Sequence, residues 1–216
     1  MNNSEIFPHI DHTLLRATAT EGEIFRLCKE ALKYKTASVC IPACYVKLVR
    51  EKFSELNICT VIGFPLGYST TAAKCAETRE AVGDGADEID MVINLGWVKD
   101  GKFSEVRREI EDVKAACGGK ILKVIIETCC LTDREKIELC KCVTNAKADY
   151  IKTSTGFGTA SAHIEDIRLF KKHIGSDVKI KAAGGVKTKA DLEMFLNEGC
   201  DRIGTSSAVK LLIGGE

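Results

Sequence analysis

The sequence predicts an α/β fold, a closed parallel (β/α)8 TIM barrel that forms a single domain over residues 1–216. Three observations lead to this prediction. Eight short apolar runs alternate with longer amphipathic segments along the whole chain. No linker, repeat or low-complexity tract divides the chain. Its 216 residues are enough for one substantial core and lie near the compact end for such barrels.

The expected strands are short runs rich in valine and isoleucine, as is typical of strands that are buried on both faces. Two of these runs end in lysine, and one carries acidic residues among its apolar ones. The predicted strands are His9–His12, Ser38–Ile41, Thr60–Gly63, Glu88–Ile93, Leu122–Glu127, Tyr150–Lys152, Lys179–Lys181 and Arg202–Gly204.

The segments between the strands have apolar residues near every third or fourth position, which is the period of an amphipathic helix. Thr20 and Thr132 stand where helix N-caps are expected. Gly83, Gly118 and Gly199 stand where helices are expected to end. The predicted helices are Glu21–Tyr34, Tyr45–Leu56, Ala72–Gly83, Phe103–Cys117, Asp133–Asn145, Ala162–Ile174 and Lys189–Glu198, followed by a short helix within Ser206–Leu212.

An open, doubly wound sheet is the competing fold. It predicts fewer strands and usually a Gly-x-Gly-x-x-Gly sequence directly after the first strand. Here the segment after the first predicted strand is His12–Leu15, which contains no glycine. We therefore favour the barrel.

Charge and hydropathy exclude two classes of partner. The chain has 31 Lys plus Arg and 31 Asp plus Glu, so its net charge is zero. Proteins that bind nucleic acid through their overall field are basic, so no nucleic-acid partner is predicted. No run of about 18 apolar residues occurs, so no membrane span is predicted either.

The chain contains eleven cysteines, an odd and unusually large number. The first residues, Met1–Ile10, are polar and do not resemble a secretory signal, so a disulfide framework is not expected. The cysteine spacings also match no zinc motif. We expect mostly buried, reduced thiols in a cytoplasmic protein without a bound metal. The closest pairs are Cys40 and Cys44, Cys129 and Cys130, and Cys140 and Cys142.

Two lysines, Lys152 and Lys181, end adjacent predicted strands and are followed by small residues and glycine. The carboxyl ends of barrel strands carry the active site, so both side chains are expected in one pocket. At a separation of ~6 Å and an effective dielectric constant near ~20, their repulsion is about 3 kcal/mol, or about two pKa units. One of the two would then be a usable amine nucleophile near neutral pH.

Asp90 lies within an apolar strand, where an unpaired carboxylate is costly. It predicts either a buried structural ion pair or a functional group, which would transfer protons or hold a lysine charged. Asp11 has the same two interpretations. Glycines and hydroxyl residues follow the last strands and predict a phosphate cradle, since backbone N–H groups can approach an anion there. The expected cradle residues are Gly156, Gly184, Gly185, Ser206 and Ser207.

The strand-end segments, taken in order over nearly the whole chain, resemble those of deoxyribose-phosphate aldolases of the shorter bacterial type. The lysine motif alone is moderately specific, whereas the ordered set is very specific. The matching segments are Ile10–Leu15, Ala37–Cys40, Val61–Gly67, Asp87–Asn94, Leu122–Thr128, Lys152–Phe157, Lys181–Val186 and Gly204–Ser207.

The resemblance implies a class I aldolase that interconverts 2-deoxy-D-ribose 5-phosphate with D-glyceraldehyde 3-phosphate and acetaldehyde, without a metal or other cofactor. It implies that Lys152 forms the Schiff base, that Lys181 lowers the pKa of Lys152 and assists proton transfer, and that Asp90 relays the proton. It assigns phosphate binding to the glycines and serines of the expected cradle. It also implies a homodimer and makes Cys40 a candidate for inactivation by aldehydes.

Two other functions remain open from the residues. Segments around Cys44 and Ala160 depart from the family pattern, which leaves room for another Schiff-base aldolase or a transaldolase-like enzyme. A non-catalytic sugar-phosphate-binding barrel is the third interpretation, and it predicts loss of an amine or carboxylate that this chain retains. Lys187 and Phe157 replace an arginine and a lysine of many family members, which bears on phosphate affinity.

Overall fold

The structure, a computed structural model, describes residues 1–214, so positions 215 and 216 of the predicted domain lie outside the described residues. Its eight parallel strands are β1 (Ile10–Thr13), β2 (Ser38–Ile41), β3 (Ile58–Ile62), β4 (Glu88–Val92), β5 (Ile121–Ile125), β6 (Tyr150–Lys152), β7 (Lys179–Ala183) and β8 (Arg202–Thr205). They pair in sequence order, and β1 pairs with β8 to close the barrel. The predicted barrel is confirmed, and the competing open sheet is wrong because the first and last strands are joined.

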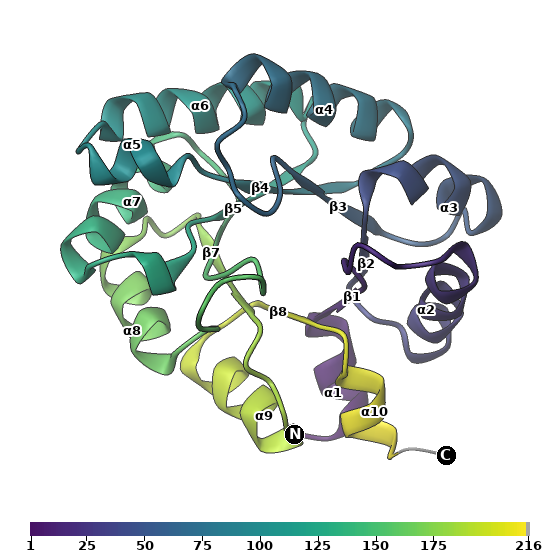
Figure 1. Ribbon diagram of the computed structural model, residues 1–216. Coiled ribbons are helices and arrows are strands. Elements are labelled where there is room, and N and C mark those ends of the chain that lie inside the picture. Colours follow the sequence, from purple (N-terminus) through teal and green to yellow (C-terminus); the bar gives the residue numbers. More distant parts are fainter. Residues whose placement is uncertain (215–216) are drawn as a thin grey trace.

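Helices surround the barrel on its outer face (Figure 1). They are α1 (Asn3–Ile6), α2 (Glu21–Tyr34), α3 (Val46–Lys52), α4 (Thr71–Gly83), α5 (Leu95–Lys99), α6 (Phe103–Ala116), α7 (Asp133–Asn145), α8 (Ile164–His173), α9 (Lys189–Glu198) and α10 (Ala208–Ile213). The expected cap at Thr132 is confirmed: it forms a reciprocal capping box with Glu135. The expected end at Gly199 is confirmed too, since this residue adopts a left-handed φ of 109° after α9.

Several predicted boundaries differ from the structure. The helix predicted over Tyr45–Leu56 is helical only over α3, because Phe53 leaves the helical region with φ −134° and ψ 66°. Its apolar period continues to Leu56, which is buried without being helical. The strand predicted to end at Glu127 stops at Ile125, and Glu127 adopts a left-handed φ of 54°. The short helices α1 and α5 were not predicted, since four or five residues show no period.

Alternate residues of each strand face opposite sides of the barrel wall. Ile89 and Met91 of β4 belong to the hydrophobic core that lies between the strands and the helices. Glu88 and Asp90 of the same strand contact charged side chains of other strands across the barrel. The main core is therefore a ring between sheet and helices, and the barrel interior is free to hold polar groups.

None of the helices in residues 1–214 combines the length and the apolar character needed to cross a bilayer. The two ends of the described chain lie side by side, with α1 against α10 (Figure 1). The Asn3 amide donates a hydrogen bond of 2.5 Å to the carbonyl of Leu212 there. This contact joins the first helix to the last one.

Candidate active site

A cavity of about 450 Å³ opens at the carboxyl ends of the strands. Its wall combines an amine, glycines, hydroxyl residues and a few apolar side chains. The cavity therefore brings Lys152 together with all five residues expected in the phosphate cradle. The lining residues that the sequence predicted are Lys152, Gly156, Gly184, Gly185, Ser206 and Ser207.

Lys152, the last residue of β6, reaches the cavity while only 3% of the residue is exposed. Its Nζ donates a hydrogen bond of 2.7 Å to Oδ2 of Asp90. In the sheet register it is paired directly with Lys181 of β7, so the two side chains leave neighbouring strands at one level. The register explains why two lysines far apart in sequence meet.

Lys181 is buried and donates a hydrogen bond of 2.6 Å to the same Oδ2 of Asp90. Because both contacts end on one oxygen, the two amine nitrogens lie closer than the ~6 Å assumed from the sequence. Lys181 Nζ also lies 2.5 Å from Oδ2 of Asp11. Burial alone would lower the pKa of Lys181, but Asp11 and Asp90 outweigh burial and raise it. Lys181 is therefore held as an ammonium ion.

Asp90 is fully buried and sits at the centre of the charged groups. Its Oδ1 accepts a hydrogen bond of 2.8 Å from Lys123 Nζ, and its Oδ2 accepts those from Lys152 and Lys181. Burial alone would raise the pKa of the Asp90 carboxyl, but the three lysines outweigh burial and hold the pKa well below its ordinary value. Asp90 is thus a carboxylate that receives hydrogen bonds from three amines.

A second layer of charges lies beneath Asp90. Lys123 of β5 contacts Glu88 at 2.6 Å, and Arg202 of β8 contacts Glu88 at 2.9 Å. Arg202 also forms an ion pair with Asp11, which in turn accepts a hydrogen bond of 2.8 Å from Ser38. Every carboxylate in this layer faces at least two cations, which is what makes such burial tolerable.

The sequence did not predict Lys123, Glu88 or Arg202 as part of this site. Lys123 gives the same signal as Asp90, since both are charged residues inside an apolar strand run. Asp11 was left between a structural and a functional interpretation, and it lies in direct contact with Lys181. A charged residue in a strand that is otherwise apolar is a general sign of a buried polar site, and it could have pointed to these residues. It could not have shown which groups they contact.

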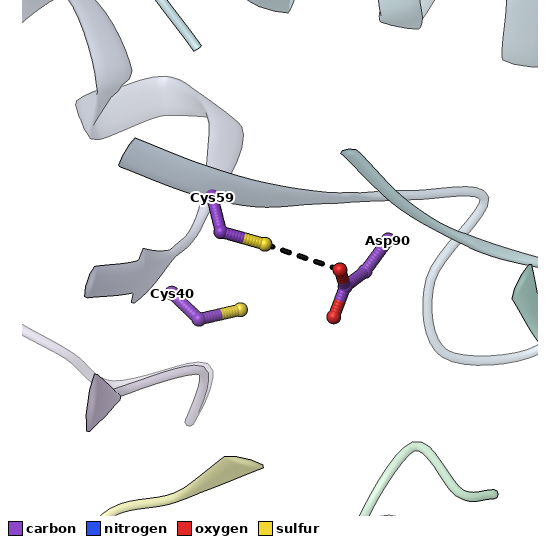
Figure 2. Close-up of side chains that lie close together, drawn as sticks. All are labelled: Cys40, Cys59 and Asp90. Carbon is purple, nitrogen blue, oxygen red and sulfur yellow. Dashed lines mark hydrogen bonds between the residues drawn. The ribbon is translucent and has the colours of Figure 1, made fainter. Parts of the chain in front are cut away.

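Two thiols lie beside Asp90, as Figure 2 shows. Cys59 donates a hydrogen bond of 3.1 Å to Oδ1 of Asp90, and its register partner on β2 is Cys40. The neighbouring Cys59 thiol lowers the pKa of the Cys40 thiol more than burial raises it. Eight of the eleven cysteines are buried, which agrees with the expectation of mostly buried thiols.

Cys40, Cys59 and Asp90 have ligand atoms within 4.8 Å of one another, a spacing that could hold a metal ion. Both oxygens of Asp90, however, already accept hydrogen bonds from lysine ammonium groups. A cation placed there would have to displace those ammonium groups, so the arrangement favours amine chemistry over metal binding.

Two glycines of the cradle have backbone φ angles that are unusual for other residues. Gly184 and Gly185 follow β7 with φ values of 77° and 75°, which side chains rarely adopt. A Cβ on Gly184 would lie 2.7 Å from Oγ of Ser161, so this turn has no space for a side chain. Because neither glycine carries a side chain, the backbone of this turn can approach a ligand closely.

The loop after β6, which follows Lys152, is held by Glu127. The backbone N–H of Thr155 donates to both carboxylate oxygens at 3.3 Å, and the Thr155 hydroxyl donates to Oε2. The backbone N–H of Phe157 then donates to the Thr155 hydroxyl at 3.0 Å. These bonds fix the loop that supplies Gly156 to the cavity.

Comparison with known proteins supports one family. Residues 6–210 match the model of the DeoC/LacD family aldolases. A deoxyribose-phosphate aldolase of Clostridium botulinum is 62% identical, with 100% of this chain and 98% of the relative covered. A deoxyribose-phosphate aldolase of Clostridioides difficile is 52% identical over 96% of this chain and 95% of its own length.

A solved structure agrees with these relatives. The deoxyribose phosphate aldolase of Aeropyrum pernix, described as a tetramer, superposes with a TM-score of 0.90 at 32% identity, covering 98% of this chain and 91% of its own. The match spans the barrel as well as the loops that form the cavity. The chain therefore belongs to the DeoC/LacD family of aldolases, as a member similar over its full length to the deoxyribose-phosphate aldolases.

Proposed function

We propose that this chain is a class I aldolase that cleaves 2-deoxy-D-ribose 5-phosphate reversibly to D-glyceraldehyde 3-phosphate and acetaldehyde. The observation that carries the proposal is the shared oxygen of Asp90, which accepts hydrogen bonds from Lys152 and Lys181 at the cavity. An amine, a carboxylate and an ammonium ion in hydrogen-bond contact are the groups that Schiff-base aldol chemistry needs.

Charge balance supports Lys152 as the nucleophile. The cluster holds four cationic side chains, Lys123, Lys152, Lys181 and Arg202, against three carboxylates. Loss of one proton would make the cluster neutral. Lys152 contacts one carboxylate, and the other three cations contact two or more each. Lys152 therefore loses the least stabilisation on becoming the neutral amine, and it is the lysine that reaches the cavity.

The chemistry begins when Lys152 attacks the aldehyde carbon of the open-chain sugar. Loss of water leaves a protonated imine, which can accept an electron pair. Removal of the proton from the C3 hydroxyl then breaks the C2–C3 bond and releases D-glyceraldehyde 3-phosphate. The bonding electrons remain on the enzyme as an enamine. Protonation of that enamine at C2 and hydrolysis of the resulting imine release acetaldehyde and restore Lys152.

Asp90 and Lys181 serve proton transfer in this scheme. Asp90 is a buried carboxylate in contact with Lys152, so it can accept the proton that the amine loses as the carbinolamine forms and return it to the hydroxyl that leaves as water. Lys181 holds the same oxygen and remains cationic, which keeps Asp90 ionised between proton transfers. The glycines and serines across the cavity receive the phosphate group through N–H and O–H donors.

Borohydride trapping tests the proposed function. The protein is incubated with 2-deoxy-D-ribose 5-phosphate and borohydride, digested, and analysed for the modified peptide by mass spectrometry. We expect a reduced adduct on Lys152, together with release of acetaldehyde in the absence of borohydride. Lys152→Ala should show neither adduct nor turnover, because the covalent pathway is lost.

Lys179→Met is the matched control, since Lys179 begins the same strand as Lys181 and is exposed. It should retain both adduct and turnover. An unmodified Lys152 with no aldehyde released would overturn the proposal. Faster turnover of a longer ketose phosphate would instead support the transaldolase-like alternative, and stabilisation by the sugar phosphate without turnover would support a binding protein.

We also propose that the protein is a cytoplasmic homodimer formed by a single domain over residues 1–216. The burial of most of its free thiols suits a reducing compartment. A homodimer is expected from the family resemblance, and the Aeropyrum pernix relative is described as a tetramer. Light scattering of the purified protein decides between the two assemblies.

A further inference from the structure

The cavity contains little charge to balance a phosphate group. Among the described residues that line it, the charged side chains are Arg16 and Lys152. The glycines and serines of the cradle are neutral donors. If Lys152 is used for covalent chemistry, as the proposed function requires, Arg16 is the remaining cation that a phosphate dianion meets in the cavity.

Arg16 stands close to the cradle because of the barrel's closure. It follows β1, and β1 pairs with β8, whose following loop carries Ser206 and Ser207. Arg16 and Ser206 also line together a neighbouring hollow of about 260 Å³ on the side of α2. Two separate hollows therefore have both Arg16 and Ser206, at one end of the cradle, in their walls.

The present partner of Arg16 is easily exchanged. Its guanidinium forms an ion pair with Glu23 near the start of α2, with 45% of the Arg16 side chain and 30% of the Glu23 side chain exposed. Ion pairs at such exposed positions contribute only about 0–1 kcal/mol. A guanidinium facing phosphate oxygens forms the same kind of charge-assisted, two-bond contact that Arg16 now makes with Glu23, and a phosphate dianion carries the larger negative charge. Phosphate can therefore compete with Glu23 for Arg16.

Lys187 is the competing cation, since it stands where many family members carry arginine. Lys187 is exposed, and its backbone N–H is bonded to Asp191 at 2.9 Å. It is not among the described residues that line the cavity. This position favours a role at the start of α9 over contact with a ligand in the cavity.

We propose that Arg16 is the residue that gives this enzyme its preference for a phosphorylated sugar, by turning from Glu23 to the phosphate group when the substrate binds. This proposal rests on the proposed function and adds to it the cation of the phosphate site. Glu23 then competes with the phosphate group for the guanidinium of Arg16 and keeps it near the cradle residues.

The test compares 2-deoxy-D-ribose 5-phosphate with unphosphorylated 2-deoxy-D-ribose. The measured quantity is the ratio of kcat/KM for the two sugars in the wild type, Arg16→Gln, Lys187→Gln and Arg168→Gln. We expect Arg16→Gln to lower this ratio at least tenfold, mainly through a higher KM for the phosphorylated sugar. Inorganic phosphate should also inhibit Arg16→Gln more weakly than the wild type.

Arg168→Gln is the matched control, because Arg168 forms a similarly exposed ion pair with Glu198 on the outer helices. It should leave the ratio unchanged. Glu23→Gln should have the opposite effect to Arg16→Gln and raise the ratio, since it frees the guanidinium. Glutamine still serves the capping box at the start of α2, so this variant decides the question even if Arg16→Gln fails to fold.

The proposal is overturned if Arg16→Gln keeps the wild-type ratio, if Lys187→Gln alone lowers it, or if Glu23→Gln leaves it unchanged or lowers it. Each of these outcomes leaves the aldolase function intact, because the wild type still turns over both sugars. A wild-type protein with neither turnover nor a Lys152 adduct would instead remove the proposed function.

Discussion

Asp11 determines how the two lysines differ, since Asp90 binds both of them. The sequence predicts mutual repulsion between Lys152 and Lys181 and offers Asp90 as a partner that holds one lysine charged. In the structure both amines bind one carboxylate oxygen, and Lys181 has a second carboxylate, Asp11, that Lys152 does not contact. The difference in carboxylate partners, more than repulsion alone, separates a lysine that can become neutral from one that stays charged.

Lys181→Met tests this division of roles. Because Lys181 assists proton transfer without forming the imine, we expect kcat for cleavage to fall roughly 10²–10⁴-fold, as for the loss of other acid–base groups. Slow borohydride trapping at Lys152 should persist, which separates this variant from Lys152→Ala. Lys179→Met, on the same strand, is the control. A borohydride adduct at position 181 in the wild type would reverse the assignment of the two lysines.

At the level of elements, a buried ion pair joins α4 to α6. Lys74 and Glu109 are both fully buried and lie 2.9 Å apart. Lys74 Nζ also donates to the carbonyls of Gly67 and Val92, at 2.6 and 2.8 Å. The ammonium group of Lys74 therefore links the turn after β3 to the end of β4, the strand that carries Asp90. The helical period of this segment gave no indication of that contact.

Glu109→Gln removes the negative charge and leaves Lys74 as an uncompensated buried cation. We expect the free energy of unfolding at neutral pH to fall by about 3–5 kcal/mol, measured by urea unfolding followed by circular dichroism. Glu111→Gln is the control on the same helix, since its ion pair with Arg107 is exposed and is worth about 0–1 kcal/mol. Equal losses for the two variants would contradict the role given to Lys74.

At the level of the whole molecule, the charged interior makes stability depend on acid pH. Burial would raise the pKa of Asp11 and of Asp90, but the cations around them lower both values. A carboxyl with a lowered pKa stabilises the fold fully above its unfolded pKa of about 3.9, and this contribution is lost as pH falls through the lower folded value. Lys123 and Lys181 have raised pKa values, so their contributions persist below about 10.4 and are lost only in strong base.

Asp11→Asn tests this dependence. At neutral pH it leaves Lys181 and Arg202 with one carboxylate fewer, so we expect a loss of about 3–5 kcal/mol in the free energy of unfolding. The difference from the wild type should shrink as pH falls below about 4, because the Asp11 carboxyl of the unfolded chain then takes up a proton, while the native carboxyl with its lowered pKa keeps its charge until lower pH. Asp133→Asn, with a side chain 77% exposed, should change little at any pH. A pH-independent difference for Asp11→Asn would contradict the charge argument.

Much of this protein follows from the sequence alone. Local periodicity and turn residues determined the eight strands and the main helices, because both depend on neighbours within a few positions. The rule that barrel sites lie at strand ends then led to Lys152, Lys181 and the cradle around Gly184 and Ser206. Family resemblance completed the assignment of the chemistry.

Only the tertiary structure decided which groups meet inside the barrel. Asp90 of β4 reaches Lys152 of β6 and Lys181 of β7, and Arg202 of β8 reaches Glu88 of β4, across the interior. Such contacts depend on how the closed sheet is tilted and staggered, which no local pattern encodes. The same closure sets β1 beside β8 and so brings Arg16 to the cradle, a position that the sequence gives no reason to expect.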